Sequence, residues 1–159
     1  MPVVMTKRDE ELLETLTLKV HLFTLLQAAT AWWGTGPQAI RNARERLGKL
    51  STAGLVERSQ VNLFPMLSLN TPEVSWTPGG SMPQFGPIAY RFQKRWDAAM
   101  RLETVYIATR KAANQFGGFG GKFKHRTQLT HDVHVTEIYL RLNERDIGPG
   151  IIVTTDEAV

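Results

Sequence analysis

Apolar residues near the start of the chain recur at the three- and four-residue spacing of amphipathic helices. The first such stripe consists of Leu12, Leu13, Leu16 and Val20. Thr6 lies ahead of this stripe and is followed by acidic residues, a combination that favours a helix N-terminus. We expect a second helix to begin near Thr24 and to end before Gly34.

Residues 37–54 predict a basic amphipathic helix. Pro37 suits the first helical position because its missing amide hydrogen would have no partner there, and Gly54 is typical of a helix end. The apolar side is expected to carry Ile40, Ala43, Leu47 and Leu50. The opposite side is expected to carry Gln38, Arg41, Asn42, Glu45 and Lys49, with Arg44 and Arg46 on its flanks.

The residues after this helix predict two strands joined by a long connection. Val56–Phe64 is expected to form the first strand, and the alternation of Ile88, Tyr90 and Phe92 predicts the second. The connection over residues 65–86 is rich in proline and glycine and would form an enlarged wing. Three helices followed by a hairpin predict a winged helix-turn-helix, which is a mainly α fold with a small β-hairpin wing (α+β).

The later part of the chain is predicted to add C-terminal helices to this fold. One helix is expected over residues 97–114 and another near residues 128–143. The glycine cluster of residues 117–121 separates them. Residues 151–155 have strand character without an expected partner.

These elements predict two parts in the chain of 159 residues. Residues 1–95 would form the winged helix-turn-helix domain with its enlarged wing. Residues 96–159 would form a helical extension, which either dimerises through residues 97–114 or begins a second domain that is truncated here.

The composition narrows the class of protein. Hydrophobic residues make up 42% of the chain, so a packed core is expected. The absence of cysteine excludes disulfides and thiolate metal sites and fits a reducing compartment. The N-terminus turns acidic too early for a signal peptide, and no apolar run reaches membrane-spanning length. We therefore expect a soluble, cytoplasmic protein without membrane contact.

Positive charge is concentrated in the middle of the chain, whose formal net charge is +4. Residues 91–126 hold nine Lys or Arg against only Asp97 and Glu103, whereas residues 132–159 are mainly acidic. This distribution favours a polyanion-binding surface on part of the molecule. Solvated helix faces without a ligand are the alternative.

Double-stranded DNA is the polyanion that a winged helix-turn-helix would bind. Arg41 and Arg44 would donate to phosphates or to guanine edges. Asn42 or Gln38 would pair with adenine. The predicted DNA-binding residues are Gln38, Arg41, Asn42, Arg44, Glu45, Lys49, Arg91, Lys94 and Arg95. In the wing, Trp76 is expected either to cap the core or to pack in an oligomer.

The glycine cluster does not match a phosphate-binding loop. Phe116 occupies the position of a required glycine, and Phe123 that of the required Ser or Thr. We instead expect a flexible basic linker near DNA phosphates, with the basic residues Lys122, Lys124, His125 and Arg126.

His131, His134 and Glu137 form the cluster with the clearest metal-ligand chemistry. The two histidines are three residues apart and share a helix face, which suits a divalent metal. Two nitrogen ligands nevertheless leave the site incomplete, so we predict no metal and no cofactor. The chain also lacks a recognisable nucleophile–base pair, and we predict that it is not an enzyme.

Four short stretches of the chain carry a resemblance to a known family. They are Thr6–Leu13, Phe23–Thr24, Arg46–Arg58 and Leu129–Tyr139. Together they resemble the replication-relaxation family of bacterial plasmids, integrative elements and phages. The resemblance implies an N-terminal winged helix, a later helix with a His-Asp phrase, and a role in the replication of mobile elements.

The sequence therefore predicts a double-stranded DNA-binding protein that acts in replication control or transcriptional regulation of a mobile element. A homodimer through residues 97–114 is a further expectation. One alternative is a winged-helix module for protein interaction or dimerisation that does not read DNA. A remote alternative is a metal-dependent nuclease that uses His131, His134 and Glu137.

Overall fold

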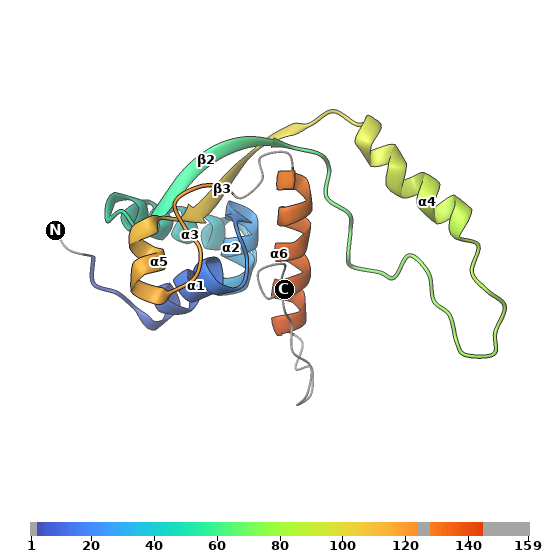
Figure 1. Cartoon of the computed structure of the whole chain (residues 1–159), viewed down its shortest axis with the longest axis horizontal. Coiled ribbons are helices and arrows are strands. Elements are labelled where there is room, and N and C mark those ends of the chain that lie inside the picture. The colour runs from blue at the N-terminus through green and yellow to red at the C-terminus, as the bar shows by residue number, and fades with distance from the viewer. Residues whose placement is uncertain (1–2, 124–127, 145–159) are drawn as a thin grey trace.

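The computed structural model describes residues 3–123 and 128–144, which form an α+β fold with a small antiparallel sheet (Figure 1). In chain order the elements are α1 (Lys7–Leu18), β1 (Phe23–Thr24), α2 (Leu25–Trp32), α3 (Pro37–Thr52), β2 (Val56–Leu63), α4 (Phe85–Lys94), the 3-10 helix η1 (Arg95–Asp97), β3 (Arg101–Ala108), α5 (Arg110–Phe116) and α6 (Leu129–Glu144). None of the helices in these two ranges is long and apolar enough to span a membrane.

The three strands form one sheet in the order β1-β3-β2, with both pairings antiparallel. β3 lies in the centre and pairs with β2 from Val56 opposite Ala108 to Leu63 opposite Arg101. The short strand β1 pairs with the other edge of β3. This sheet joins the residues that precede α2 to those that follow the long connection after β2.

The sheet is a middle layer because both of its faces are covered. Side chains alternate between the two faces along each strand. Tyr106 and Ala108 pack in one core cluster with buried leucines of α1 and α3. Val105 and Ile107, on the opposite face, pack in a second cluster with Val133 of α6. α1 and α3 on one face and α6 on the other therefore share β3 as a common support.

The predicted starts of the first helices are confirmed by their capping contacts. Thr6 and Asp9 form reciprocal side-chain-to-backbone hydrogen bonds at the start of α1. Thr24 and Gln27 form the same pair at the start of α2. α3 begins at the predicted proline, and Gly54 beyond its end has φ +73°, a conformation that favours glycine. Local side-chain chemistry thus fixes the beginnings of these helices.

The strand predicted around Ile88–Phe92 is wrong, because this segment lies in α4. Alternation of apolar residues suggested a strand, but Ile88 and Phe92 also stand four residues apart and share one face of a helix. The predicted solvent-facing strand position of Arg91 accordingly becomes a position on α4.

The helix predicted over residues 97–114 is also wrong, because residues 101–108 form β3 and only residues 110–116 form a helix, α5. β3 is buried on both faces from Val105 to Ala108, so its apolar residues are continuous rather than alternating. The extension predicted to be helical from residue 96 therefore begins with a strand. Val105, predicted on the dimer helix, lies in the core.

Residues 64–100, called the arm below, leave the sheet after Leu63 and return to it at Arg101 (Figure 1). The arm contains α4 and η1, and none of its residues is buried. The remaining described residues are called the body. The wing predicted over residues 65–86 is thus part of a longer segment that carries its own helix.

The glycine cluster is packed against the body, which corrects the prediction of a flexible linker at residues 117–121. The backbone N–H of Phe119 donates to the carbonyl oxygen of Thr17 at 2.8 Å. A Cβ atom at Gly118 would lie 2.0 Å from that same oxygen, so a larger residue would clash with the backbone. Lys122 is exposed, whereas the other three basic residues predicted near phosphates, Lys124, His125 and Arg126, lie outside the described residues. Residues 151–155 also lie outside them.

Candidate nucleic-acid interface

α3 separates an apolar face from a polar outer face as predicted. Ala39, Ala43, Leu47 and Leu50 are buried, and Ile40 is half-buried. The exposed residues include all six predicted on this helix, namely Gln38, Arg41, Asn42, Arg44, Glu45 and Lys49. The helix therefore presents one continuous polar surface to solvent while its other side packs in the core.

Two contacts order the side chains on this outer face. Gln38 Nε2 donates to Asn42 Oδ1 at 2.8 Å, and Lys49 Nζ donates to Glu45 Oε1 at 2.7 Å. The hydrogen bond from Lys49 holds the pKa of the Glu45 carboxyl below its usual value. Within residues 3–123 and 128–144, Arg41 forms no ion pair, and the same holds for Arg44. Their guanidinium groups are thus available to an external anion.

Arg46, predicted on the flank of α3, instead fixes the helix to α1. Its Nε donates to Asp9 Oδ1 at 2.9 Å, its Nη2 pairs with Asp9 Oδ2, and Nη2 also donates to the Val4 carbonyl oxygen at 2.7 Å. Burial alone would raise the pKa of Asp9, but the hydrogen bonds from Arg46 and Thr6 outweigh burial and lower it. The sequence predicted only an acidic first turn after Thr6, because the ion pair of Asp9 with Arg46 joins positions far apart in the chain.

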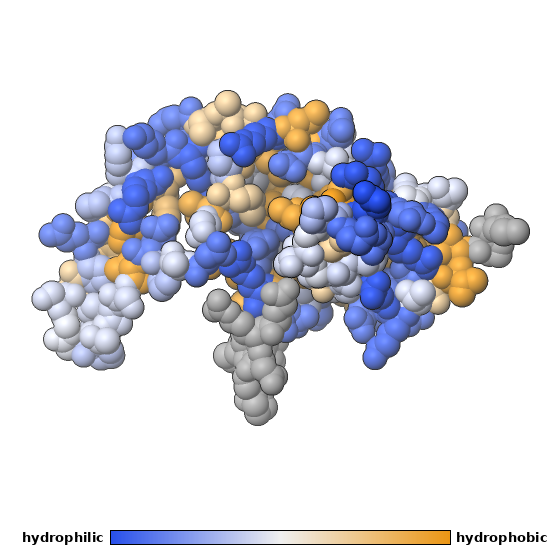
Figure 2. All heavy atoms as spheres, turned by 180° about the vertical axis from the view of Figure 1, so that it is seen from behind, coloured by the Kyte–Doolittle hydropathy of each residue, from blue (hydrophilic) through white to orange (hydrophobic). Residues whose placement is uncertain are grey.

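The basic surface of α3 continues onto β2. Arg58 of β2 stands opposite Tyr106 in the sheet register and is exposed. Burial raises the pKa of Tyr106, and the positive charges of Arg58 and Arg44 both act against that rise. Both guanidinium groups therefore lie near the same phenol. Figure 2, which views the molecule from behind, shows hydrophilic residues over much of the body, interrupted by apolar patches.

The basic residues predicted in the wing lie on α4 and η1, which Figure 1 shows at the other end of the molecule from α3. Arg91 pairs with Glu73 at 3.0 Å. Lys94 Nζ lies 5.8 Å from the centre of the Tyr90 ring. Arg95 is half-buried, and its guanidinium group stacks over the neighbouring Trp96 ring at 4.6 Å. The structure thus separates the two predicted basic groups.

The three residues considered as metal ligands do not converge. His131 is exposed and lies 3.4 Å from Asp132 Oδ1. His134 is buried, with its Nδ1 hydrogen-bonded to the Thr130 carbonyl oxygen at 2.7 Å. Glu137 instead accepts hydrogen bonds from α2 and from its own helix. In the part of the chain that the structure describes, no group of three or more His, Cys, Asp or Glu side chains is arranged to hold a metal ion.

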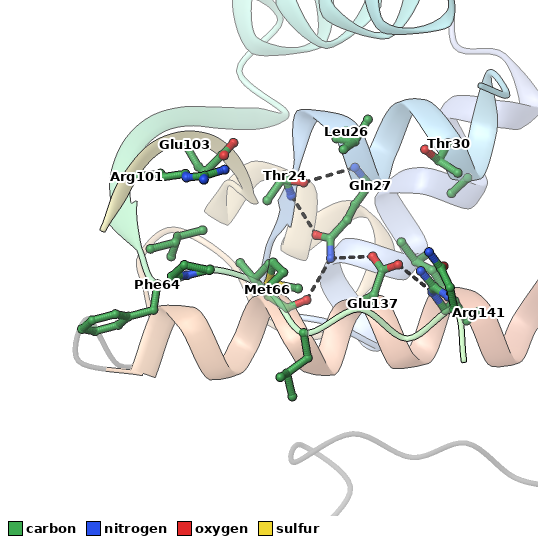
Figure 3. Close-up of a pocket in the computed structure, with 17 residues that line it drawn as sticks. Thr24, Leu26, Gln27, Thr30, Phe64, Met66, Arg101, Glu103, Glu137 and Arg141 are labelled. Carbon is green, nitrogen blue, oxygen red and sulfur yellow. Dashed lines mark hydrogen bonds and ion pairs between the residues drawn. The ribbon is translucent and has the colours of Figure 1, made fainter. Parts of the chain in front are cut away.

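A cavity of about 700 Å³ lies between α2, α6 and the start of the arm (Figure 3). Gln27 donates to Glu137 Oε2 at 3.0 Å and to the Val133 carbonyl oxygen at 2.8 Å. Glu137 also accepts a hydrogen bond from Arg141 Nε at 2.7 Å, and Arg141 donates to Asn70 of the arm at 3.1 Å. No local sequence pattern predicts this network, since it joins three separate segments, α2, α6 and the arm.

Trp76, which was expected to cap the core or to pack in an oligomer, lies half-exposed in the arm. Its indole Nε1 donates to the Gly80 carbonyl oxygen at 3.2 Å. This contact closes a local turn of the arm. The core is therefore covered by other residues.

Comparison with known proteins gives no match. No protein-family model matches the chain, and no curated protein or solved structure matches it. Any function must therefore be inferred from the residues of the chain itself.

Proposed function

We propose that the protein binds double-stranded DNA as a winged helix-turn-helix, with α3 as its recognition helix and the hairpin of β2 and β3 as the base of its wing. Support comes from the order of elements, α1-β1-α2-α3-β2-β3, and from the packing of α2 against α3. A recognition helix needs a second helix that fixes its angle to the groove. Asp9 and Arg46 add a further fixed point between α1 and α3.

The observation that carries this proposal is that Arg41 and Arg44, which form no ion pair within the described residues, lie exposed on the outer face of a firmly held helix. Guanidinium groups bind phosphates and the O6 and N7 atoms of guanine. Asn42 and Gln38 lie on the same face and offer amide groups that suit adenine. Arg58 extends the phosphate-binding surface onto β2, and the arm adds secondary contacts through Arg91 and Lys94.

The proposed biological setting rests on the resemblance of four short stretches of the sequence to replication-relaxation proteins. We infer a role in replication control or transcriptional regulation of a mobile element in the cytoplasm. Both roles need an affinity for duplex DNA, so a binding measurement tests their common premise.

The experiment is a titration of a fluorescent DNA duplex with the full chain, followed by anisotropy at several salt concentrations. Each phosphate contact contributes about 0.9 to the slope of log affinity against log salt. Replacing Arg41 and Arg44 together by alanine should weaken binding at least about tenfold and lower the slope by about 2.

The matched control replaces Lys7 and Lys19 of the α1 region by alanine. Both are exposed, and this variant changes the net charge by the same amount. It should alter affinity less than about twofold, because distant surface charges act only through the screened field of the protein. Equal weakening by the two double variants, or no binding at low salt, would contradict the proposal.

A further inference from the structure

The arm has an outgoing limb, which follows Leu63, and a returning limb, which leads to Arg101. Both limbs contact one side chain of α6, the imidazole of His134. On the outgoing limb, the backbone N–H of Leu67 donates to His134 Nε2 at 2.9 Å. On the returning limb, Arg95 Nη1 lies 3.0 Å from the same nitrogen. His134 therefore holds two segments that are far apart in the arm.

These partners determine which ring nitrogen carries the proton. A backbone N–H and a guanidinium group can only donate, so Nε2 of His134 must accept both contacts. Nδ1 must then carry the hydrogen and donate to the Thr130 carbonyl oxygen at 2.7 Å. This arrangement is possible only while the imidazole is neutral. A proton on Nε2 would face two donors and place a positive charge against Arg95.

The surroundings of His134 favour the neutral ring. Burial lowers its pKa, the hydrogen bond to Thr130 acts in the opposite direction, and the charge of Arg95 lowers the pKa again. On α6 itself, His131 adds a small lowering effect and Glu137 a small raising effect. The outgoing limb contributes no titratable side chain next to the ring, since residues 64–67 are Phe, Pro, Met and Leu.

We propose that His134 is a proton-operated latch, which holds both limbs of the arm on α6 while the ring is neutral and releases them when Nε2 is protonated. Release removes the hydrogen bond from Leu67 and sets the imidazolium against Arg95. The arm then remains attached to the body through its covalent ends and through other contacts, such as that between Asn70 and Arg141. Acidification therefore loosens the arm around Leu67 and Arg95 without unfolding the body.

The latch has a consequence for DNA binding that rests on the proposed function. The arm carries Arg91 and Lys94, and its held position determines where these cations lie relative to α3. Release of the arm would make their phosphate contacts less favourable, because ordering a free segment on DNA costs conformational entropy. Protonation of His134 should accordingly weaken DNA binding.

The direct test is hydrogen exchange of the Leu67 amide in the full chain at pH values from about 8 to about 4.5, a range that extends well below the usual pKa of histidine because that of His134 is lowered. After correction for the intrinsic exchange rate, protection should fall about tenfold across this range while β3 stays protected. Nitrogen NMR of the wild-type ring should show protonated Nδ1 and bare Nε2 at the upper pH, with Nε2 gaining its proton as protection falls.

His134→Gln is the informative variant, because an amide oxygen can accept the same hydrogen bonds without titrating. Its Leu67 protection should change less than about twofold over the same range. The matched control, His131→Gln, removes an exposed histidine three residues away and should behave as the wild type. Constant protection in the wild type, a ring protonated on Nε2 at the upper pH, or a loss that disappears in His131→Gln would overturn the latch.

The consequence for DNA is tested separately with the same duplex titration at both ends of the pH range. The wild type should lose affinity at the lower pH by more than His134→Gln does, and the ratio of the two losses measures the coupling. An equal loss would refute the coupling while leaving the exchange result intact. No binding at either pH would refute the proposed function, and the exchange measurement would still decide the latch.

Discussion

α3 and α4 are both basic amphipathic helices, but the body anchors one and leaves the other uncovered. α3 buries a row of apolar residues that includes Leu47 and Leu50. α4 has no buried residue, and its side chains Phe85 and Tyr90 are 56% and 64% exposed. The comparison shows that an amphipathic pattern predicts an apolar face without revealing whether anything covers it. Only the covered helix is fixed well enough to present base-reading side chains in a defined orientation.

The difference arises from the number and type of attachments. α3 is fixed along its length by the core and by the ion pair of Arg46 with Asp9, and Lys111 binds a carbonyl oxygen at its C-terminus. The arm that contains α4 meets the body mainly through polar contacts near its two ends, including those of His134. Polar contacts near the surface contribute less stability than a buried apolar row.

The largest expected effect concerns the attachment of α3 to α1. Asp9→Ala removes the buried partner of a partly exposed ion pair together with the capping carboxylate of α1, and the two losses should cost about 3–4 kcal/mol of unfolding free energy. Urea denaturation followed by circular dichroism measures this loss. Glu10→Ala, an exposed neighbour, should change stability by no more than about 0.5 kcal/mol. Similar values for the two variants would show that the ion pair does not hold α3.

A pair of truncations compares the two helices directly. Leu47→Ala should cost about 3 kcal/mol, because it leaves a cavity in the core. Phe85→Ala on α4 should cost less than about 0.5 kcal/mol, because its ring has little packing to lose. Denaturation of both variants at one protein concentration provides the test. A cost for Phe85→Ala that approaches the cost for Leu47→Ala would mean that α4 is covered in solution.

Two glycines extend the comparison to irregular segments and helix ends. Gly118→Ala should cost about 2 kcal/mol, because its Cβ would overlap the Thr17 carbonyl oxygen at a positive φ. Gly86→Ala in α4 meets no atom within 4 Å and should leave global stability within about 0.5 kcal/mol of the wild type. Thermal unfolding of the two variants distinguishes them. Equal midpoints would contradict the close packing of the glycine cluster.

The smallest effect is a pH dependence that involves the body alone. The pKa of Asp9 is lower in the folded protein than in the unfolded chain, so its stabilising contribution is complete above about pH 4 and is lost as pH falls through the folded pKa. The difference in stability between wild type and Asp9→Ala should therefore shrink below about pH 4. Urea titrations from neutral to acidic pH measure it. A difference that stays constant would argue against a lowered pKa.

The sequence predicted the features that depend on local chemistry. The caps at Thr6 and Thr24, the end of α3 at Gly54 and the exposed face with Arg41 all follow from neighbouring residues. The sequence prediction exchanged strand and helix between residues 88 and 108, and for β3 the error followed from burial that no local pattern records. β3 became a strand because two layers cover it, and α4 became a helix although nothing covers it.

The residues of the candidate site show the same difference between features that depend on neighbouring residues and features that depend on distant ones. Outward-facing residues such as Arg44 were predictable from helical periodicity, since solvent exposure needs no partner. Arg46 and Arg95 have the same chemistry, yet both turn inward to partners far along the chain, Asp9 and His134. A sequence pattern identifies a basic residue, but only the tertiary structure shows whether its side chain already has a partner within the protein.

The register that ends with Leu63 opposite Arg101 makes the arm an insertion between two paired residues. The strand ladder would close equally well over a tight two-residue turn. Closing the long loop instead costs about 2.6 kcal/mol more in chain entropy, a modest penalty because that cost grows only with the logarithm of length. The arm is therefore separable from the body in folding, and its length and content can be changed while α3 keeps its shape.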